Sequence, residues 1–125
     1  MDKVQHFEIP VDDMGRAKEF YGKVFNWQLT DVPGMDYTMA YTTEVDEKFM
    51  PKEVGVINGG LAKRVPIAPH PTIAITVESC EAALKKIADA GGTVLSQPQP
   101  VGDMGIYAHA RDTEGNVIGI WQNLK

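Results

Sequence analysis

Apolar and polar residues alternate near the start of the chain and then give way to a helical pattern. Between His6 and Val11 the odd-numbered positions are apolar and the even-numbered ones are polar or proline, which is typical of a half-buried strand. Asp13 can cap a helix after this strand, and four apolar residues from Ala17 to Val24 follow at the i, i+3, i+4 and i+7 spacing of one helix face. The pattern therefore predicts a β-α unit.

The same pattern returns in the second half of the chain, at an offset of 66 residues, the distance from Ile9 to Ile75. Residues 72–77 alternate, Ser79 can cap a helix, and an apolar stripe runs over residues 83–88. Four pairs of residues under this offset are identical: Ile9 and Ile75, Val11 and Val77, Ala17 and Ala83, and Leu29 and Leu95. This agreement indicates an internal repeat.

Strand-like stretches separated by turn residues follow each predicted helix. They cover 27–32, 37–45 and 54–63 in the first half, and 93–97, 105–111 and 117–122 in the second half. A half of about 60 residues can bury only one face of its sheet. The sequence therefore predicts one α+β domain of two tandem β-α-β-β-β modules, residues 1–64 and 65–125, that together form a curved mixed sheet with a concave cleft.

The strand faces opposite the helices are predicted to line this cleft. A glycine in the middle of a strand marks a bulge or makes room for a close neighbour, and we expect Gly59, Gly60 and Gly119 to leave space for a ligand. Four aromatic residues can stack on a planar ligand or pack on the sheet: Tyr37, Tyr41, Tyr107 and Trp121. The predicted ligand-binding residues are His6, Glu8, Tyr41, Asn58, Thr72, Gly119 and Trp121.

Composition narrows the range of partners. The 125 residues carry 12 Lys and Arg against 17 Asp and Glu, a formal charge of −5, which repels nucleic acids. No stretch approaches the roughly 20 apolar residues of a membrane span, and the first residues lack the pattern of a signal peptide. The single cysteine has no disulfide partner, so we expect a cytoplasmic protein. Because of its charge and the lack of a long apolar stretch, we expect it to bind neither nucleic acid nor membrane.

That cysteine, Cys80, falls in the first turn of the second predicted helix. Amides at a helix N-terminus lower the pKa of a thiol, so we expect a lowered pKa at Cys80. No partner base is identifiable in the sequence, which argues against a nucleophilic role.

Three segments carry a family resemblance. The strand end Val11-Asp12-Asp13-Met14, the pair Phe20-Tyr21 on the first helix and the closing residues 112–118 are similar to the vicinal oxygen chelate superfamily. Residues 7–14 together with Arg16-Ala17 resemble its short glyoxalase-like subgroup in particular. This superfamily holds glyoxalase I, bleomycin-resistance proteins and extradiol dioxygenases. The resemblance covers nearly the whole chain and implies the fold that these proteins share.

The resemblance also implies where a metal would be held. In the superfamily's enzymes four side chains from the first and last strands of the two modules bind a divalent metal, usually His or Gln and Glu in the first module and His and Glu in the second. Carried over to this chain, the first position is His6, which matches; the others fall at 58–60, Thr72 and Gly119, where neither His nor Glu occurs. A lone imidazole does not hold a hard divalent ion, so we expect no such metal centre and no other cofactor.

The preferred hypothesis is a glyoxalase/bleomycin-resistance-like protein that binds a small molecule in the concave cleft without the usual metal. The alternative is a metal-dependent lyase, isomerase or dioxygenase with a rearranged site around His6 and Glu8, to which His70 or His109 adds a displaced ligand. A third hypothesis is a non-enzymatic interaction module whose cleft is filled by side chains.

His6 and Glu8 lie on one face of the first predicted strand and are candidates for an acid/base pair. They can equally line a pocket or an interface, so the sequence leaves open whether a reaction is catalysed. We also expect a homodimer, because the edge strands of a two-module unit need cover.

Overall fold

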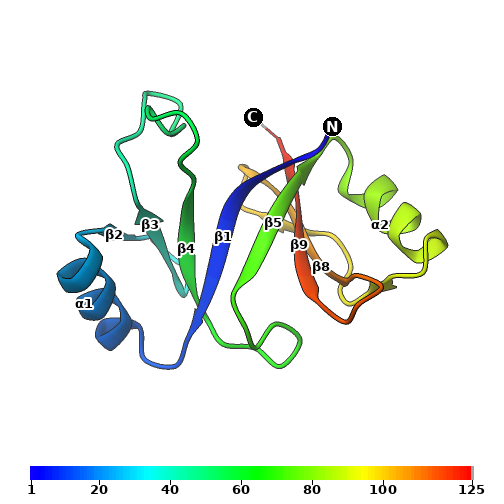
Figure 1. Ribbon diagram of the computed structural model, residues 1–125, viewed down its shortest axis with the longest axis horizontal. Helices are drawn as coiled ribbons and strands as arrows, with labels where there is room; N and C mark the ends of the chain where they lie inside the picture. Colours follow the sequence, from blue (N-terminus) through cyan, green and yellow to red (C-terminus); the bar gives the residue numbers. More distant parts are fainter. Residues whose placement is uncertain (125) are drawn as a thin grey trace. The chain divides into compact units, whose positions relative to one another are not determined.

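The computed structural model describes residues 1–124, which divide into two units. The first unit comprises His6–Pro71, and the second comprises Met1–Gln5 together with the residues from Thr72 on. Each unit contains one helix and its own set of paired strands (Figure 1). Neither helix in the described part of the chain has the length and apolar character that crossing a membrane requires.

The first unit holds the earlier half of the repeat. Its elements are β1 (Lys3–Val11, from His6 on), α1 (Met14–Phe25), β2 (Gln28–Asp31), β3 (Tyr37–Tyr41) and β4 (Asn58–Lys63). Strand β4 lies between β1, which runs parallel to it, and β3, which is antiparallel; β2 completes the order β2-β3-β4-β1.

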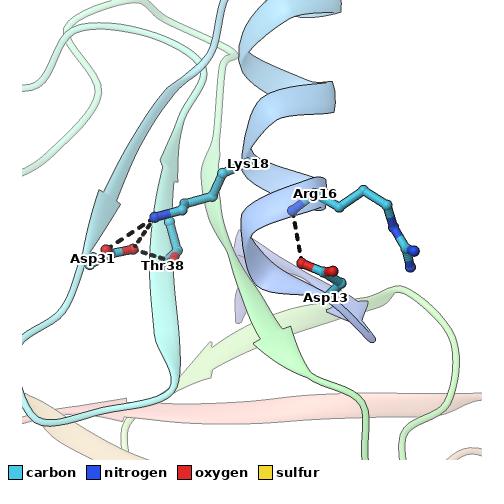
Figure 2. A network of polar contacts seen from close by, with 5 residues as sticks. All are labelled: Asp13, Arg16, Lys18, Asp31 and Thr38. Atoms are coloured by element: carbon cyan, nitrogen blue, oxygen red, sulfur yellow. Dashed lines mark hydrogen bonds and ion pairs between the residues drawn. The ribbon is translucent and has the colours of Figure 1, made fainter.

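Both ends of helix α1 are capped. The Asp13 side chain accepts a hydrogen bond from the backbone N–H of Arg16 at 3.0 Å (Figure 2), which satisfies one of the unpaired donors of the first turn. The helix ends at Asn26, whose φ of 61° lies in the left-handed region that asparagine tolerates better than most residues. The predicted capping by Asp13 is confirmed.

The second unit repeats this arrangement with one added strand. Its elements after residue 71 are β5 (Thr72–Val77), α2 (Cys80–Asp89), β6 (Thr93–Val94), β7 (Gln99–Val101), β8 (Gly105–Arg111) and β9 (Val117–Asn123). Strand β9 is parallel to β5 and antiparallel to β8, and β8 also pairs with both β6 and β7. The predicted α+β fold of two β-α-β-β-β modules is confirmed, with β7 as an insertion that the pattern did not indicate.

The two helices pack to different depths. Helix α2 buries Cys80 and Leu84 in a cluster that also contains Ala108, Ala110 and Ile120. Helix α1 buries none of its residues, and the side chains of Phe20, Val24 and Phe25 are each more than half exposed. The apolar core is therefore better developed in the second unit than around α1.

The environment of Cys80 overturns the expectation of a lowered thiol pKa. Cys80 is fully buried, and its Sγ lies 3.9 Å from the backbone oxygen of Ile120. Burial raises the pKa of this thiol, because a thiolate loses its hydration in an apolar core. Cys80 is therefore a packing residue of the core and not an activated thiol.

We expect Cys80 to resist thiol reagents in the folded protein, because only the thiolate reacts and the core disfavours it. The measurement is the rate of labelling by a chromogenic disulfide at neutral pH, with and without denaturing urea. An Ala88→Cys variant is the control, since residue 88 is exposed on the same helix; one of its two thiols should react at once. Rapid labelling of the folded parent protein would contradict the assignment.

Candidate functional site

Three polar side chains of the first unit meet on the sheet face opposite α1. The Nε2 atom of His6 lies 2.7 Å from the Tyr37 hydroxyl oxygen, and that hydroxyl donates a hydrogen bond to Glu8 Oε2 at 2.8 Å. His6 Nε2 and Glu8 Oε2 are 3.7 Å apart, and their side chains are 29% and 18% exposed. We call these three residues the His6–Tyr37–Glu8 cluster.

The ladder between strands explains why these side chains meet. His6 and Glu8 are two residues apart on β1, so both point to the same face. Glu8 pairs with Gly60 of β4, and Gly60 pairs with Met39 of β3. Tyr37 is two residues from Met39 and therefore shares this face, from which its ring reaches back across β4 to β1.

The hydrogen bonds of the cluster determine which of its atoms carry hydrogens. An ionised carboxylate only accepts hydrogen bonds, so the single proton of the Tyr37 hydroxyl is used on Glu8. The Tyr37 oxygen then accepts from His6, which requires a hydrogen on Nε2. Neutral His6 is therefore the Nε2–H tautomer, and its lone pair is on Nδ1.

Glycines make room for the aromatic rings on these sheets. A Cβ atom on Gly60 would overlap with the Tyr37 ring and hydroxyl, and a Cβ on Gly119 would overlap with Tyr107. The pairs are Tyr37 over Gly60, Phe7 over Gly59 and Tyr107 over Gly119. The expectation that Gly59, Gly60 and Gly119 leave space for a ligand is wrong, because aromatic side chains fill that space.

Tyr37 and Tyr107 hold the same register position in the two units. Each pairs directly with a residue of the parallel strand, Tyr37 with Ala62 and Tyr107 with Trp121. By the same register Gly60 corresponds to Gly119, and the partners of these glycines on the first strands are Glu8 and Ala74. The tyrosine-over-glycine arrangement is therefore repeated, but only the first unit places a carboxylate beside it.

Asn58 lies beside His6 as its partner in the β1–β4 ladder. Its Oδ1 accepts hydrogen bonds from the backbone N–H groups of Thr42, at 2.7 Å, and Thr43, at 3.2 Å. Its Nδ2 is buried and has no hydrogen-bond partner among residues 1–124. An unpaired buried donor costs about 1–3 kcal/mol, so the sequence-predicted Asn58 marks an unsatisfied polar position next to the cluster.

The other residues predicted for the site lie in several places. Tyr41 is half-buried on β3, on the same face as Tyr37. Thr72, Gly119 and Trp121 belong to the second unit, where the Trp121 Nε1–H donates to Asn123 Oδ1 at 2.7 Å. His109 also belongs there, with its ring 4.9 Å from that of Tyr107 between centroids; His70 is exposed in the segment before β5.

The donors of the cluster do not match the metal centre that the family resemblance implies. His6 and Glu8 supply one nitrogen and one carboxylate, and their close neighbour is a tyrosine hydroxyl. Across residues 1–124 no group of three His, Cys, Asp or Glu side chains is placed to hold one metal ion. The described residues therefore do not fit the four-ligand metal centre of the superfamily's enzymes.

A second polar network lies at an open cavity on the helix side of the first unit. Lys18 of α1 donates to both carboxylate oxygens of Asp31, at 3.0 and 3.1 Å, and the buried Thr38 hydroxyl donates to Asp31 at 2.8 Å (Figure 2). The Lys18 hydrogen bond, followed by that from Thr38, holds the pKa of Asp31 below its usual value. The cavity measures about 450 Å³ and carries charges of both signs, including Asp12, Asp36 and Lys63. The network ties α1 to β2 and β3.

Tyr37 is the residue that the sequence reveals least. The pattern indicates it only as one of four aromatic residues that can stack or pack, since 29 positions separate it from Glu8 along the chain. The feature that would have pointed to Tyr37 is its equivalence to Tyr107 in the second unit. That equivalence is hidden in the sequence, because the loops before the two tyrosines differ in length and the offset of 66 no longer holds there.

Comparison with known proteins identifies the fold. A family model described as "Glyoxalase/Bleomycin resistance protein/Dioxygenase superfamily" matches residues 3–120. Two curated relatives, each named "Putative glyoxylase CFP32" and found in Mycobacterium bovis and Mycobacterium tuberculosis, are 28% identical over 120 residues. The match covers 92% of this chain and 43% of each relative, so the chain spans less than half the length of these proteins.

Solved structures show the same fold at low sequence identity. A hypothetical protein of Bacillus halodurans superposes with a TM-score of 0.66 at 18% identity, over 99% of this chain and 96% of the other. Methylmalonyl-CoA epimerase of Mycobacterium tuberculosis gives a TM-score of 0.62 at 14% identity, over 95% and 86% of the two chains. At such identities the likeness concerns the fold alone.

Replacing Tyr37 with Phe should release the tautomer of His6, because the acceptor for Nε2–H is lost. Nitrogen NMR of the imidazole rings measures this directly: we expect His6 to show the Nε2–H tautomer in the parent protein and a mixture in Tyr37→Phe. Tyr41→Phe removes a hydroxyl from the same strand and should leave the signal unchanged. An unaltered His6 signal in Tyr37→Phe would refute the proton assignment.

Lowering the pH should weaken the hold of Asp31 on α1. Its pKa is depressed in the fold, so its stabilising contribution is complete above the usual carboxyl pKa of about 3.9 and is lost as the pH falls towards the folded value. We expect Lys18→Met to lower the thermal midpoint more at pH 7 than at pH 3. Lys23→Met, on the same helix, is the control; an equal effect at both pH values would argue against the Asp31 link.

Proposed function

Because the chain belongs to the glyoxalase/bleomycin resistance protein/dioxygenase superfamily, we propose that it binds a small molecule at the His6–Tyr37–Glu8 cluster. We propose further that it does so without the divalent metal of the superfamily's enzymes. The observation that carries this proposal is the cluster itself, a hydrogen-bonded chain from imidazole to phenol to carboxylate on a face away from the helix.

Burial of the cluster supports a binding role. Keeping a carboxylate and an imidazole half-buried costs hydration energy, and apolar side chains of similar size would pack the sheet face at lower cost. Polar groups that converge in a partly buried position are typical of sites that orient a ligand. The unpaired Nδ2 of Asn58 beside His6 adds a position that a bound water or ligand would satisfy.

The proposed absence of a metal follows from how the cluster uses its donors. His6 Nε2 and Glu8 Oε2 are each already hydrogen-bonded to the Tyr37 hydroxyl. A divalent ion on this pair would have to displace the Tyr37 hydrogen bonds and still find further ligands. The ordered hydrogen-bond chain therefore favours metal-free recognition.

A metal-dependent lyase, isomerase or dioxygenase is the second candidate. The 3.7 Å separation of His6 and Glu8 favours it, because two potential ligands lie close enough to share an ion. The names of the similar proteins, a glyoxylase and an epimerase, describe those proteins, and activities of this kind are proposals for the present chain. We keep cytoplasmic location and a homodimer as parts of the proposal; the exposed Phe20, Val24 and Phe25 of α1 support the dimer.

Metal analysis and ligand screening together test the proposal. We expect the purified protein to carry no stoichiometric Zn, Ni, Mn or Fe, and small ligands found by thermal shift to bind equally well after treatment with EDTA. Binding should be lost in His6→Ala and Glu8→Ala and kept in Glu78→Ala, an exposed carboxylate outside the cluster. Stoichiometric metal that disappears in His6→Ala would favour the enzyme, and a screen without any hit would favour an interaction module.

A further inference from the structure

We propose that the His6–Tyr37–Glu8 cluster selects small organic cations, specifically primary ammonium compounds with an aromatic or apolar body. This inference deepens the proposed function, because it assigns a ligand class to the same site. The residues that form the proposed site all belong to the first unit, His6–Pro71.

Hydrogen-bond capacity gives the first argument. The Tyr37 proton goes to Glu8 and the His6 Nε2 proton goes to Tyr37, so neither proton is left for a ligand. What the cluster still offers is the lone pair on His6 Nδ1 and the remaining lone pairs of the Glu8 carboxylate, all of which are acceptors. The ligand group that complements the three residues of the cluster is therefore a hydrogen-bond donor, and an ammonium group carries three donors and no acceptor. The neighbouring Asn58 Nδ2–H is then left for a bound water to satisfy.

Charge gives the second argument. The Glu8 side chain is 18% exposed, and its ion-pair neighbour in the first unit is His6, at 3.7 Å. No Lys or Arg of the described residues 6–71 forms an ion pair with this carboxylate. A partly buried carboxylate without a Lys or Arg partner is poorly compensated, and a bound ammonium ion supplies a positive charge whose attraction to the carboxylate is less screened than it would be in water.

The neighbouring side chains give the third argument, on the body of the ligand. Tyr37, Met39 and Tyr41 alternate along β3 and share the face of Glu8. Tyrosine rings attract cations through their faces, and a thioether adapts to irregular apolar shapes. The overall charge of −5 attracts cations and repels anions at a distance.

Three probes of similar size and different charge test the inference: benzylammonium, benzyl alcohol and benzoate. Their binding is followed by amide NMR of labelled protein at pH 8, where imidazole side chains are ordinarily neutral. We expect benzylammonium to shift the signals of Glu8, Tyr37 and Gly60 in a saturable manner. Benzyl alcohol should bind about tenfold more weakly, the effect of one charge-assisted contact, and benzoate should not saturate.

Variants separate charge from shape. Glu8→Gln keeps the size of the side chain and should weaken benzylammonium about tenfold while leaving benzyl alcohol unchanged. Glu78→Gln removes a carboxylate that is exposed outside the cluster and should change neither affinity. Amide spectra of each variant show whether it is folded, so a loss of binding can be read as a loss of the contact.

Three results would overturn the inference. One is equal or tighter binding of benzyl alcohol or benzoate at the same signals, which would leave small-molecule binding at the cluster intact but reject the cation preference. The second is saturable benzylammonium binding that Glu8→Gln does not weaken. The third is no saturable benzylammonium shift at all in a protein that binds other compounds in the thermal-shift screen.

Discussion

The packing of Tyr37 over Gly60 is the constraint on which the site depends. Only a residue without a Cβ lets the tyrosine ring lie across β4, and only from there does its hydroxyl reach both His6 and Glu8 on β1. The ring also covers a mid-strand glycine that would otherwise weaken the sheet. One contact thus stabilises the strands and fixes the direction of two protons.

The two units show how one scaffold can carry different chemistry. Each has a tyrosine over a glycine at the same register position, so the packing device is common to both. On the first strand of the second unit Thr72 and Ala74 stand where the first unit has His6 and Glu8. The repeat therefore keeps the geometry of the sheet, while the residues at these two positions of the first strand decide which unit holds a charged cluster.

The first unit contains two polar networks with different roles. The Lys18, Asp31 and Thr38 network joins a helix to two strands and satisfies its own charges, which is what a structural ion pair requires. The His6–Tyr37–Glu8 cluster leaves acceptors unmatched and a carboxylate without a full positive partner. The His6–Tyr37–Glu8 cluster thus differs from the structural network in having hydrogen-bond acceptors and a charge without full partners, and not in the kinds of residue that it contains.

Local pattern sufficed for most of the fold: alternation predicted β1 and β5, and Asp13 and Ser79 marked the starts of both helices, because strand period and capping act over a few residues. The pattern also placed His6 and Glu8 on one face. Only the tertiary structure brought in Tyr37, filled the space over Gly60 and Gly119 with aromatic rings, and buried Cys80 deeply enough to raise its pKa. These outcomes depend on which strands become neighbours and on solvent exclusion, and both arise from contacts between residues far apart in the chain.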